Sequence, residues 1–219
     1  MTVNDKSPEY EGLRFFGKMN ASISHEIRNT LAVINENAGL IKDLLLMHEK
    51  GHPLDIERVR GRVDKVLEQV RRSDSIVDNM NRFAHSIDND FLRINAGEYL
   101  EFVIKLSERF AVMKGIILKP APQEEEVELE TFPFLFENIL YLCIDTAMEN
   151  GDEEKTILIS FGKRDSRVQF RFSGLVKGVR LDKDLSSGSA EIFDRLGAGI
   201  IDENESGAFI LDMPEVLKK

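Results

Sequence analysis

The sequence predicts an α+β protein in two parts. An N-terminal antiparallel helical hairpin, residues 1–90, is expected to form a dimeric four-helix bundle, and an α/β sandwich is expected over residues 91–219. Two observations predict this class. The first part carries apolar side chains at helical spacing in two long runs. In the second part, helical runs alternate with short segments that have the two-residue period of strands. A chain of 219 residues is long enough for two small domains, each with its own core.

The first predicted helix has its apolar face from Phe16 onward. Positions separated by alternating steps of four and three residues form this face, and six of the nine are apolar. These positions are Phe16, Asn20, Ile23, Ile27, Thr30, Ile34, Asn37, Ile41 and Leu44. We expect Gly51 to end the helix, Pro53 to suit the start of the next one, and Asp55 to cap that second helix.

The second predicted helix has the same spacing with one polar exception. Its positions are Ile56, Val59, Val63, Val66, Val70, Ser73, Val77, Met80, Ala84 and Ile87. Two long helices with one apolar stripe each cannot bury both stripes as an isolated hairpin. The usual solution is a four-helix bundle made by two chains, so we expect a homodimer. The alternative is a single chain whose hairpin packs on its own second domain.

The second half of the chain mixes helices and strands. Helices are predicted at 96–114 and 133–150, and strands at 115–119, 127–131, 156–161, 167–172, 199–201 and 208–213. The last two strands form a terminal hairpin around Glu205–Gly207. This order of elements favours a sheet with helices on one face.

Charge and composition exclude several classes of function. The formal net charge of −10 is shared unequally, with −2 on residues 1–90 and −8 on residues 91–219. Nucleic acid is therefore not the expected main partner, because binding to a duplex depends on Lys and Arg at the phosphates. The sequence contains no run of roughly 18 apolar residues that could span a membrane, and its start lacks the pattern of a secretion signal.

The single cysteine, Cys143, excludes an intrachain disulfide and fits a small buried hydrophobic residue. Together with the absence of a predicted membrane span, this favours a cytoplasmic protein. We expect neither nucleic acid nor a membrane as a partner.

Residues 22–31 hold the most informative group of polar side chains. His25 follows Ile23 by two positions, about 200° around the helix, so we expect it to point away from the apolar stripe. Neutral imidazole is available near pH 7, because its unperturbed pKa is about 6.5. Glu26 could accept a hydrogen bond or a proton from the ring, which leaves the far nitrogen as the nucleophile. Asn29, one turn on, could position a water molecule or a phosphoryl oxygen.

Residues 22–31, Ser-Ile-Ser-His-Glu-Ile-Arg-Asn-Thr-Leu, resemble the phosphoacceptor box of two-component sensor histidine kinases. The elements after residue 90 resemble the ATP-binding domain that follows the helical hairpin in that family. The resemblance runs from about Phe15 to Pro214, and it implies that His25 accepts a phosphoryl group. Thr30 stands where the family usually has proline, which would bend the helix, so we expect a straighter helix here.

Other departures from the family are concentrated where it binds ATP. Asp145 aligns with an asparagine that helps to hold magnesium, and an aspartate can still bind Mg²⁺. Gly174 aligns with the aspartate that receives the adenine amino group, and Val176 aligns with the first of the two glycines after it. Of the three residues of this motif, only the second glycine, Gly178, is kept. Leu185–Glu191, with one glycine, replaces the glycine-rich phosphate segment. The resemblance thus implies a degenerate histidine kinase ATPase domain, and we expect no nucleotide and no metal as cofactor.

The leading interpretation is a dimeric histidine phosphotransfer protein of a two-component phosphorelay. His25 would accept a phosphoryl group from the receiver domain of one response regulator and donate it to another, with Glu26 and Asn29 assisting. One alternative is an active ATP-dependent histidine kinase with a divergent nucleotide site, which would bind ATP and Mg²⁺ near Asp145. Another is a non-catalytic scaffold that binds receivers through the bundle.

Other polar groups of the hairpin have simpler interpretations. We expect His48, His52 and His85 to be solvated or to cap helix ends. A basic group on the second helix is typical of a solvated face, and its functional interpretation is a docking surface for an acidic receiver. This group consists of Arg58, Arg60, Arg62, Lys65, Arg71 and Arg72.

Overall fold

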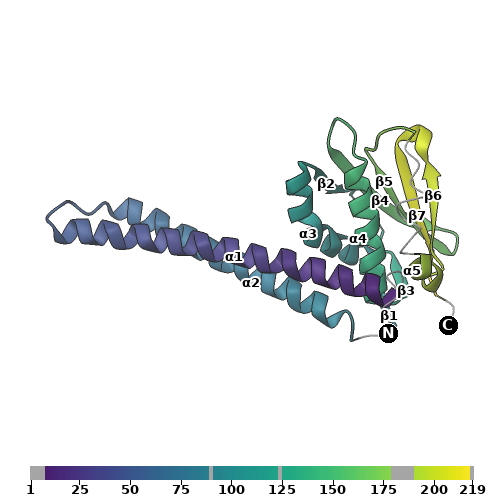
Figure 1. Ribbon diagram of the computed structural model, residues 1–219, viewed down its shortest axis with the longest axis horizontal. Helices are drawn as coiled ribbons and strands as arrows, with labels where there is room; N and C mark the ends of the chain where they lie inside the picture. Colours follow the sequence, from purple (N-terminus) through teal and green to yellow (C-terminus); the bar gives the residue numbers. More distant parts are fainter. Residues whose placement is uncertain (1–7, 89–90, 123–124, 179–189, 218–219) are drawn as a thin grey trace. The chain divides into compact units, whose positions relative to one another are not determined.

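The computed structural model describes residues 8–88, 91–122, 125–178 and 190–217. The chain folds into two compact units (Figure 1). The hairpin unit is Lys18–Phe83, and the C-terminal unit combines Ala84–Lys219 with Met1–Gly17. The expected division at residue 90 differs from this one, because both ends of the hairpin belong to the C-terminal unit.

The hairpin consists of two long helices, α1 (Pro8–Glu49) and α2 (Ile56–His85). Gly51, in the turn between them, has a φ of 93°, a left-handed conformation that favours glycine. The carboxylate of Asp55 accepts a hydrogen bond from the Arg58 N–H at 3.0 Å, so Asp55 caps α2 as predicted. Although α1 has 42 residues, neither it nor any other described helix has the apolar run that a membrane crossing needs.

The predicted stripe of α1 is its buried face, since all nine positions are buried or half-buried. The predicted stripe of α2 is only partly buried within a single chain. Val59, Val66 and Ser73 are half-buried, but the other seven positions are exposed. The buried side chains of α2 are instead Ile76 and Phe83. Because two neighbouring rows of α2 are apolar, the spacing alone does not show which row packs on α1.

Polar contacts also join the two helices. Ser73 Oγ lies 2.7 Å from Thr30 Oγ1, and Arg62 donates to Asn37 Oδ1 at 3.2 Å. These contacts explain how Thr30 and Asn37 can be buried in the seam, because buried polar atoms are stable when they are hydrogen-bonded. Helix α1 continues through Thr30 without a break, which agrees with threonine in place of proline.

Helices α3 (Ala96–Lys114) and α4 (Pro133–Glu149) have nearly the predicted bounds. The Asn95 side chain caps α3 by accepting hydrogen bonds from two backbone N–H groups of the first turn. Gly115 ends α3 in a left-handed conformation with a φ of 66°. Proline at the first position suits the start of α4.

Five strands form the main sheet in the order β2-β4-β5-β7-β6, in which β2 and β4 are parallel and the other neighbours antiparallel. The strands are β2 (Ile117–Pro120), β4 (Thr156–Arg164), β5 (Arg167–Ser173), β6 (Gly199–Glu203) and β7 (Ala208–Pro214). A separate antiparallel pair joins β1 (Leu92–Asn95) to β3 (Glu128–Thr131). Neither β1 nor the short helix α5 (Ala190–Arg195) is predicted from the sequence.

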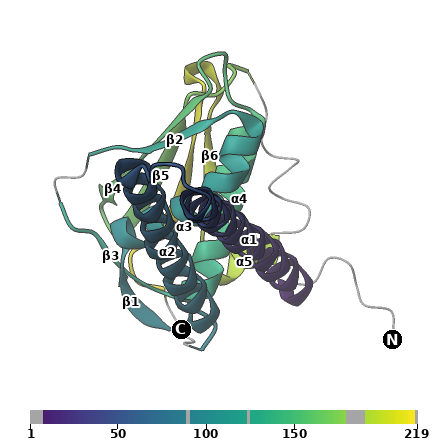
Figure 2. The same ribbon diagram turned by 90° about the vertical axis from the view of Figure 1, so that its left-hand side faces the viewer.

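Helices α3 and α4 cover one face of this sheet (Figures 1 and 2), which confirms the predicted sandwich. Phe170 and Phe172 of β5 are buried, and the ring centroid of Phe136 on α4 lies 5.6 Å from that of Phe170. Alternate side chains of β5 belong to the opposite face. There the Arg167 guanidinium pairs with the Asp212 carboxylate.

The first turns of α1 pack within the C-terminal unit. Phe15 is buried, and its ring centroid lies 5.7 Å from that of Phe134 and 5.2 Å from that of Tyr141, both on α4. Gly12 is also close to α4, since a Cβ atom added there would lie 3.3 Å from the Phe134 ring. Helix α1 is therefore shared by the two units.

Candidate functional site

His25 lies in the first half of α1 with its side chain exposed. Ile23, two positions earlier, is 6% exposed, and Thr30, five positions later, is 3% exposed. The imidazole therefore points away from the seam of the hairpin, as helical geometry predicted. An exposed ring on a regular helix is accessible to a site on another protein.

Asn29 holds the imidazole from one turn further along α1. His25 Nδ1 lies 3.2 Å from Asn29 Nδ2. The pair has two forms, because the amide can turn through 180° about its last side-chain bond. With the amide nitrogen toward the ring, Nδ1 accepts the hydrogen bond and Nε2 carries the ring proton. With the amide oxygen toward the ring, Nδ1–H donates and the lone pair of Nε2 is free to attack an electrophile.

Glu26 and Thr30 complete the surroundings of the ring. Glu26 follows His25 and is half-buried, about 100° around the helix from it. The Thr30 hydroxyl donates to the Ile27 carbonyl oxygen at 2.9 Å and so accepts from Ser73, whose Oγ is 2.7 Å away on α2. A polar layer thus joins α1 to α2 close to His25 and stabilises the backbone that carries it.

The other polar groups of the hairpin have local contacts. His48 Nδ1 lies 3.0 Å from the His52 carbonyl oxygen, and His85 Nδ1 lies 2.7 Å from the Asp88 carboxylate. These contacts are at the ends of α1 and α2, which agrees with the expected capping role. Within the basic group of α2, Arg62 is half-buried and the other five members are exposed.

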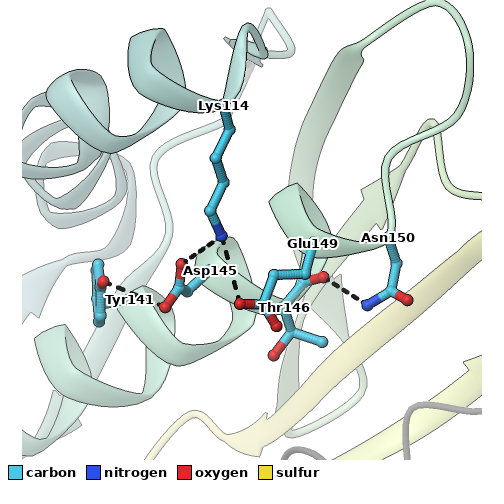
Figure 3. A network of polar contacts seen from close by, with 6 residues as sticks. All are labelled: Lys114, Tyr141, Asp145, Thr146, Glu149 and Asn150. Atoms are coloured by element: carbon cyan, nitrogen blue, oxygen red, sulfur yellow. Dashed lines mark hydrogen bonds and ion pairs between the residues drawn. The ribbon is translucent and has the colours of Figure 1, made fainter.

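Asp145, which aligns with a magnesium-binding asparagine, belongs to a polar network between α3 and α4 (Figure 3). Its Oδ1 atom lies 3.0 Å from Lys114 Nζ, and its Oδ2 atom accepts a hydrogen bond from the Tyr141 hydroxyl at 3.3 Å. Lys114 Nζ also lies 3.4 Å from Glu149 Oε1. Burial, together with the negative charge of Asp145, raises the pKa of Tyr141 far above its ordinary value, so the hydroxyl keeps its proton. Both carboxylate oxygens of Asp145 are therefore bound by side chains of the chain itself.

Gly174 and Gly178 are positions of close backbone packing. Gly174 has a φ of 93°, and a Cβ atom there would lie 2.1 Å from the Thr156 carbonyl oxygen. Its own carbonyl oxygen accepts a hydrogen bond from the Asp152 N–H at 2.9 Å. The Gly178 N–H donates to the Asn204 carbonyl oxygen at 3.0 Å. Consequently a carboxylate side chain cannot be placed at Gly174 to receive adenine, and the Gly178 N–H is already bonded.

These residues do not have the contacts expected of the Mg·ATP site in the family that the sequence resembles. Of the segment Leu185–Glu191, only Ala190 and Glu191, at the start of α5, lie within the described residues. Across the parts of the chain that the structure describes, no three His, Cys, Asp or Glu side chains are grouped as metal ligands. Cys143 is fully buried, and burial raises the pKa of its thiol, so it packs as a small apolar residue.

Among solved structures, the chain matches several histidine kinases at low identity and with TM-scores below 0.5. No protein-family model matches the sequence, and no curated protein matches it. The nucleotide-free catalytic domain of histidine kinase ThkA is 19% identical with a TM-score of 0.47, over 59% of this chain and 100% of that chain. The Acinetobacter baumannii histidine kinase AdeS is 15% identical with a TM-score of 0.48, over 82% of this chain and 95% of that chain. ThkA in complex with the response regulator TrrA is 20% identical with a TM-score of 0.45, over 96% of this chain and 65% of that chain.

Three members of the Asp145 network, Lys114, Tyr141 and Glu149, were not predicted from the sequence. Tyr141 lies four residues before Asp145, so the helical spacing could have indicated their contact. Lys114 is 31 residues from Asp145, and no local pattern brings the two together. Glu26 and Asn29, the neighbours of His25, could be identified from the sequence because they lie on the same helix as His25.

Proposed function

We propose that this protein is a dimeric histidine phosphotransfer protein that exchanges phosphoryl groups with the receiver domains of response regulators in the cytoplasm. His25 is the phosphoacceptor, Glu26 and Asn29 assist it, and neither a nucleotide nor a metal serves as its cofactor. One observation carries the proposal. The imidazole of His25 is exposed and oriented by Asn29, whereas the carboxylate of Asp145, which a kinase would use for Mg²⁺, is bound by Lys114 and a tyrosine.

The proposed transfer is a nucleophilic displacement at phosphorus. Nε2 of His25 attacks the aspartyl phosphate of a receiver, the N–P bond forms, and the P–O bond to the aspartate breaks with its electron pair on the leaving carboxylate. The ring then carries a positive charge and a proton on Nδ1. The amide oxygen of Asn29 accepts a hydrogen bond from Nδ1–H, and the carboxylate of Glu26 stabilises the charged ring. Transfer to a second receiver reverses these steps.

A homodimer accounts for the apolar surface of the hairpin. Five apolar side chains of α2 are 36% to 46% exposed, and their spacing places them in one row. They are Val63, Leu67, Val70, Val77 and Met80. Exposed apolar area costs about 25 cal/mol per Å² relative to burial, so a row of this length favours association. A second copy that presents the same row completes a four-helix bundle.

An assay of the relay tests the proposal. A receiver domain that carries a labelled phosphoryl group is mixed with the protein, and an unphosphorylated second receiver is then added. We expect label on the protein first and on the second receiver afterwards. The His25→Gln variant should take no label, and His85→Gln, which alters another exposed histidine of the hairpin, should behave as the wild type.

Two outcomes would contradict this function. Wild-type protein that stays unlabelled with every cognate receiver would exclude phosphotransfer. Labelling that persists in His25→Gln would place the phosphoacceptor elsewhere. Receivers that bind wild type and His25→Gln equally well, with no transfer to either, would instead support a scaffold.

A further inference from the structure

We propose that the C-terminal unit binds a small amphipathic monoanion, such as a medium-chain carboxylate, in an apolar cavity between the start of α1, the start of α4 and the end of α5. The cavity has a volume of about 450 Å³, within the range of about 300–1,000 Å³ that is typical of ligand sites. Its apolar walls come from Leu13, Phe16, Ile87, Phe134 and Leu135.

The cavity has a preformed wall. The Phe134 ring packs against the buried ring of Phe15, with ring centroids 5.7 Å apart, so this aromatic wall is part of the packed core of the unit. Gly12 permits the close approach, since a Cβ atom there would lie 3.3 Å from the Phe134 ring. On the open side, Leu13 is 67% exposed and Ile87 is 49% exposed. Apolar side chains left this open to water favour a ligand with a hydrocarbon tail.

Arg195 at the end of α5 determines the charge of the ligand. Among the residues that the structure describes, it is the one charged residue that lines the cavity. Its guanidinium carbon lies 5.8 Å from the centroid of the Phe132 ring, and no carboxylate among the described residues pairs with it. A guanidinium without an anionic partner beside an apolar cavity is suited to a carboxylate or sulfonate head group. The net charge of −8 on residues 91–219 disfavours highly charged anions, which leaves a monoanion as the best match.

Calorimetric titration of the full-length chain with sodium decanoate, below its micellar concentration, tests the site. We expect saturable binding of one decanoate per chain, and no saturable binding of decyltrimethylammonium, which has the same tail and the opposite charge. The Arg195→Met variant should bind decanoate about tenfold more weakly, because it loses a charge-assisted hydrogen bond. Arg164→Met, which removes an exposed arginine from the end of β4, serves as the matched control and should bind as the wild type.

Three results would overturn the proposal. They are the absence of saturable binding, equal binding of the cationic amphiphile, and equal affinity of wild type and Arg195→Met. Sedimentation of the Leu13→Gln variant tests the alternative that a second copy of the chain, and not a small ligand, fills the cavity. If Leu13→Gln dissociates a wild-type dimer and neither protein binds decanoate, the cavity belongs to the dimer interface and the ligand proposal fails. An unreactive Cys143 thiol in each variant confirms that the fold is intact, since that thiol is fully buried in the native protein.

Discussion

His25 Nδ1 lies 3.2 Å from Asn29 Nδ2, one turn further along α1. This contact occupies the ring nitrogen nearer to the backbone and leaves Nε2 as the nitrogen that faces a partner. The tautomer of the ring therefore depends on which end of the Asn29 amide is turned toward it. In the proposed mechanism, the uncharged side chain of Asn29 therefore determines which ring nitrogen of His25 acts as the nucleophile.

Replacement of Asn29 by alanine should slow phosphoryl transfer to His25 without moving the site of labelling. We expect a rate about tenfold lower, because the free ring samples other orientations and tautomers. Rapid-quench measurement of transfer from a phosphorylated receiver gives the rate. Asn35→Ala, an exposed asparagine of the same helix, is the control. Equal rates in Asn29→Ala and the wild type would show that the contact does not orient the ring.

Lys114→Met should destabilise the C-terminal unit by a few tenths of a kcal/mol to about 1 kcal/mol, the usual range for a partly exposed ion pair. The variant leaves the Asp145 and Glu149 carboxylates close together without the ammonium that lies 3.0 and 3.4 Å from them. Urea unfolding measures the loss, which should shrink at high salt because screening weakens both the attraction and the repulsion. Lys105→Met, exposed on α3, should be neutral. If Lys114→Met is as stable as the wild type, the contacts of Lys114 with Asp145 and Glu149 do not stabilise the packing of α3 against α4.

Stability at high pH should report on Tyr141. Its folded-state pKa is raised, first by burial and then by Asp145, so the folded chain keeps a proton that the unfolded chain loses near pH 10. The stability is therefore complete below about pH 10, and it falls by about 1.4 kcal/mol per pH unit above that value. The Tyr141→Phe variant has no such hydroxyl, so this contribution to the fall of stability with pH is absent from it. Urea unfolding of both proteins between pH 8 and 11 gives the difference in their free energies of unfolding. This difference should be constant up to about pH 10 and change above it. A difference that stays constant over the whole range would contradict the burial of a neutral hydroxyl.

Gly174→Ala should cost at least about 2 kcal/mol of unfolding free energy, since an alanine there has both a left-handed backbone and a clash. The clash is with the Thr156 carbonyl oxygen, 2.1 Å from the added Cβ position. Gly162→Ala is the matched control, because no atom lies within 4 Å of a Cβ atom placed there. Thermal unfolding of the two variants gives the comparison. Equal stability would mean that the backbone at Gly174 can relax and that the aspartate of a nucleotide site could be accommodated.

The sequence predicted those elements whose signals are local. Asn95 and Gly115 define the ends of α3, and the proline at the start of α4 defines its first position, so both helices had nearly correct bounds. Strand β1 was missed because its partner β3 lies more than 30 residues away, so no local hairpin pattern marks the pair. Which row of α2 packs on α1 within one chain was not predicted, because two adjacent rows are apolar.

In the candidate site too, features that depend on local spacing were predicted, and contacts between distant elements were not. The outward direction of His25 followed from its position two residues after Ile23 on a helix, and Asn29 followed from the spacing of one turn. The contact of Lys114 with Asp145 could not be predicted, because it depends on how α3 packs against α4. Likewise, the packing of Phe15 against α4 depends on tertiary contacts that helical periodicity does not specify.

The central claim is that phosphate reaches His25 from a receiver and not from a nucleotide. The most direct measurement compares two labelled donors, Mg·ATP and a phosphorylated receiver domain, and maps the phosphorylated residue by mass spectrometry under conditions that preserve phosphohistidine. Our account predicts label at His25 from the receiver and no label from ATP. Label at His25 from ATP, at a rate similar to that from the receiver, would contradict it.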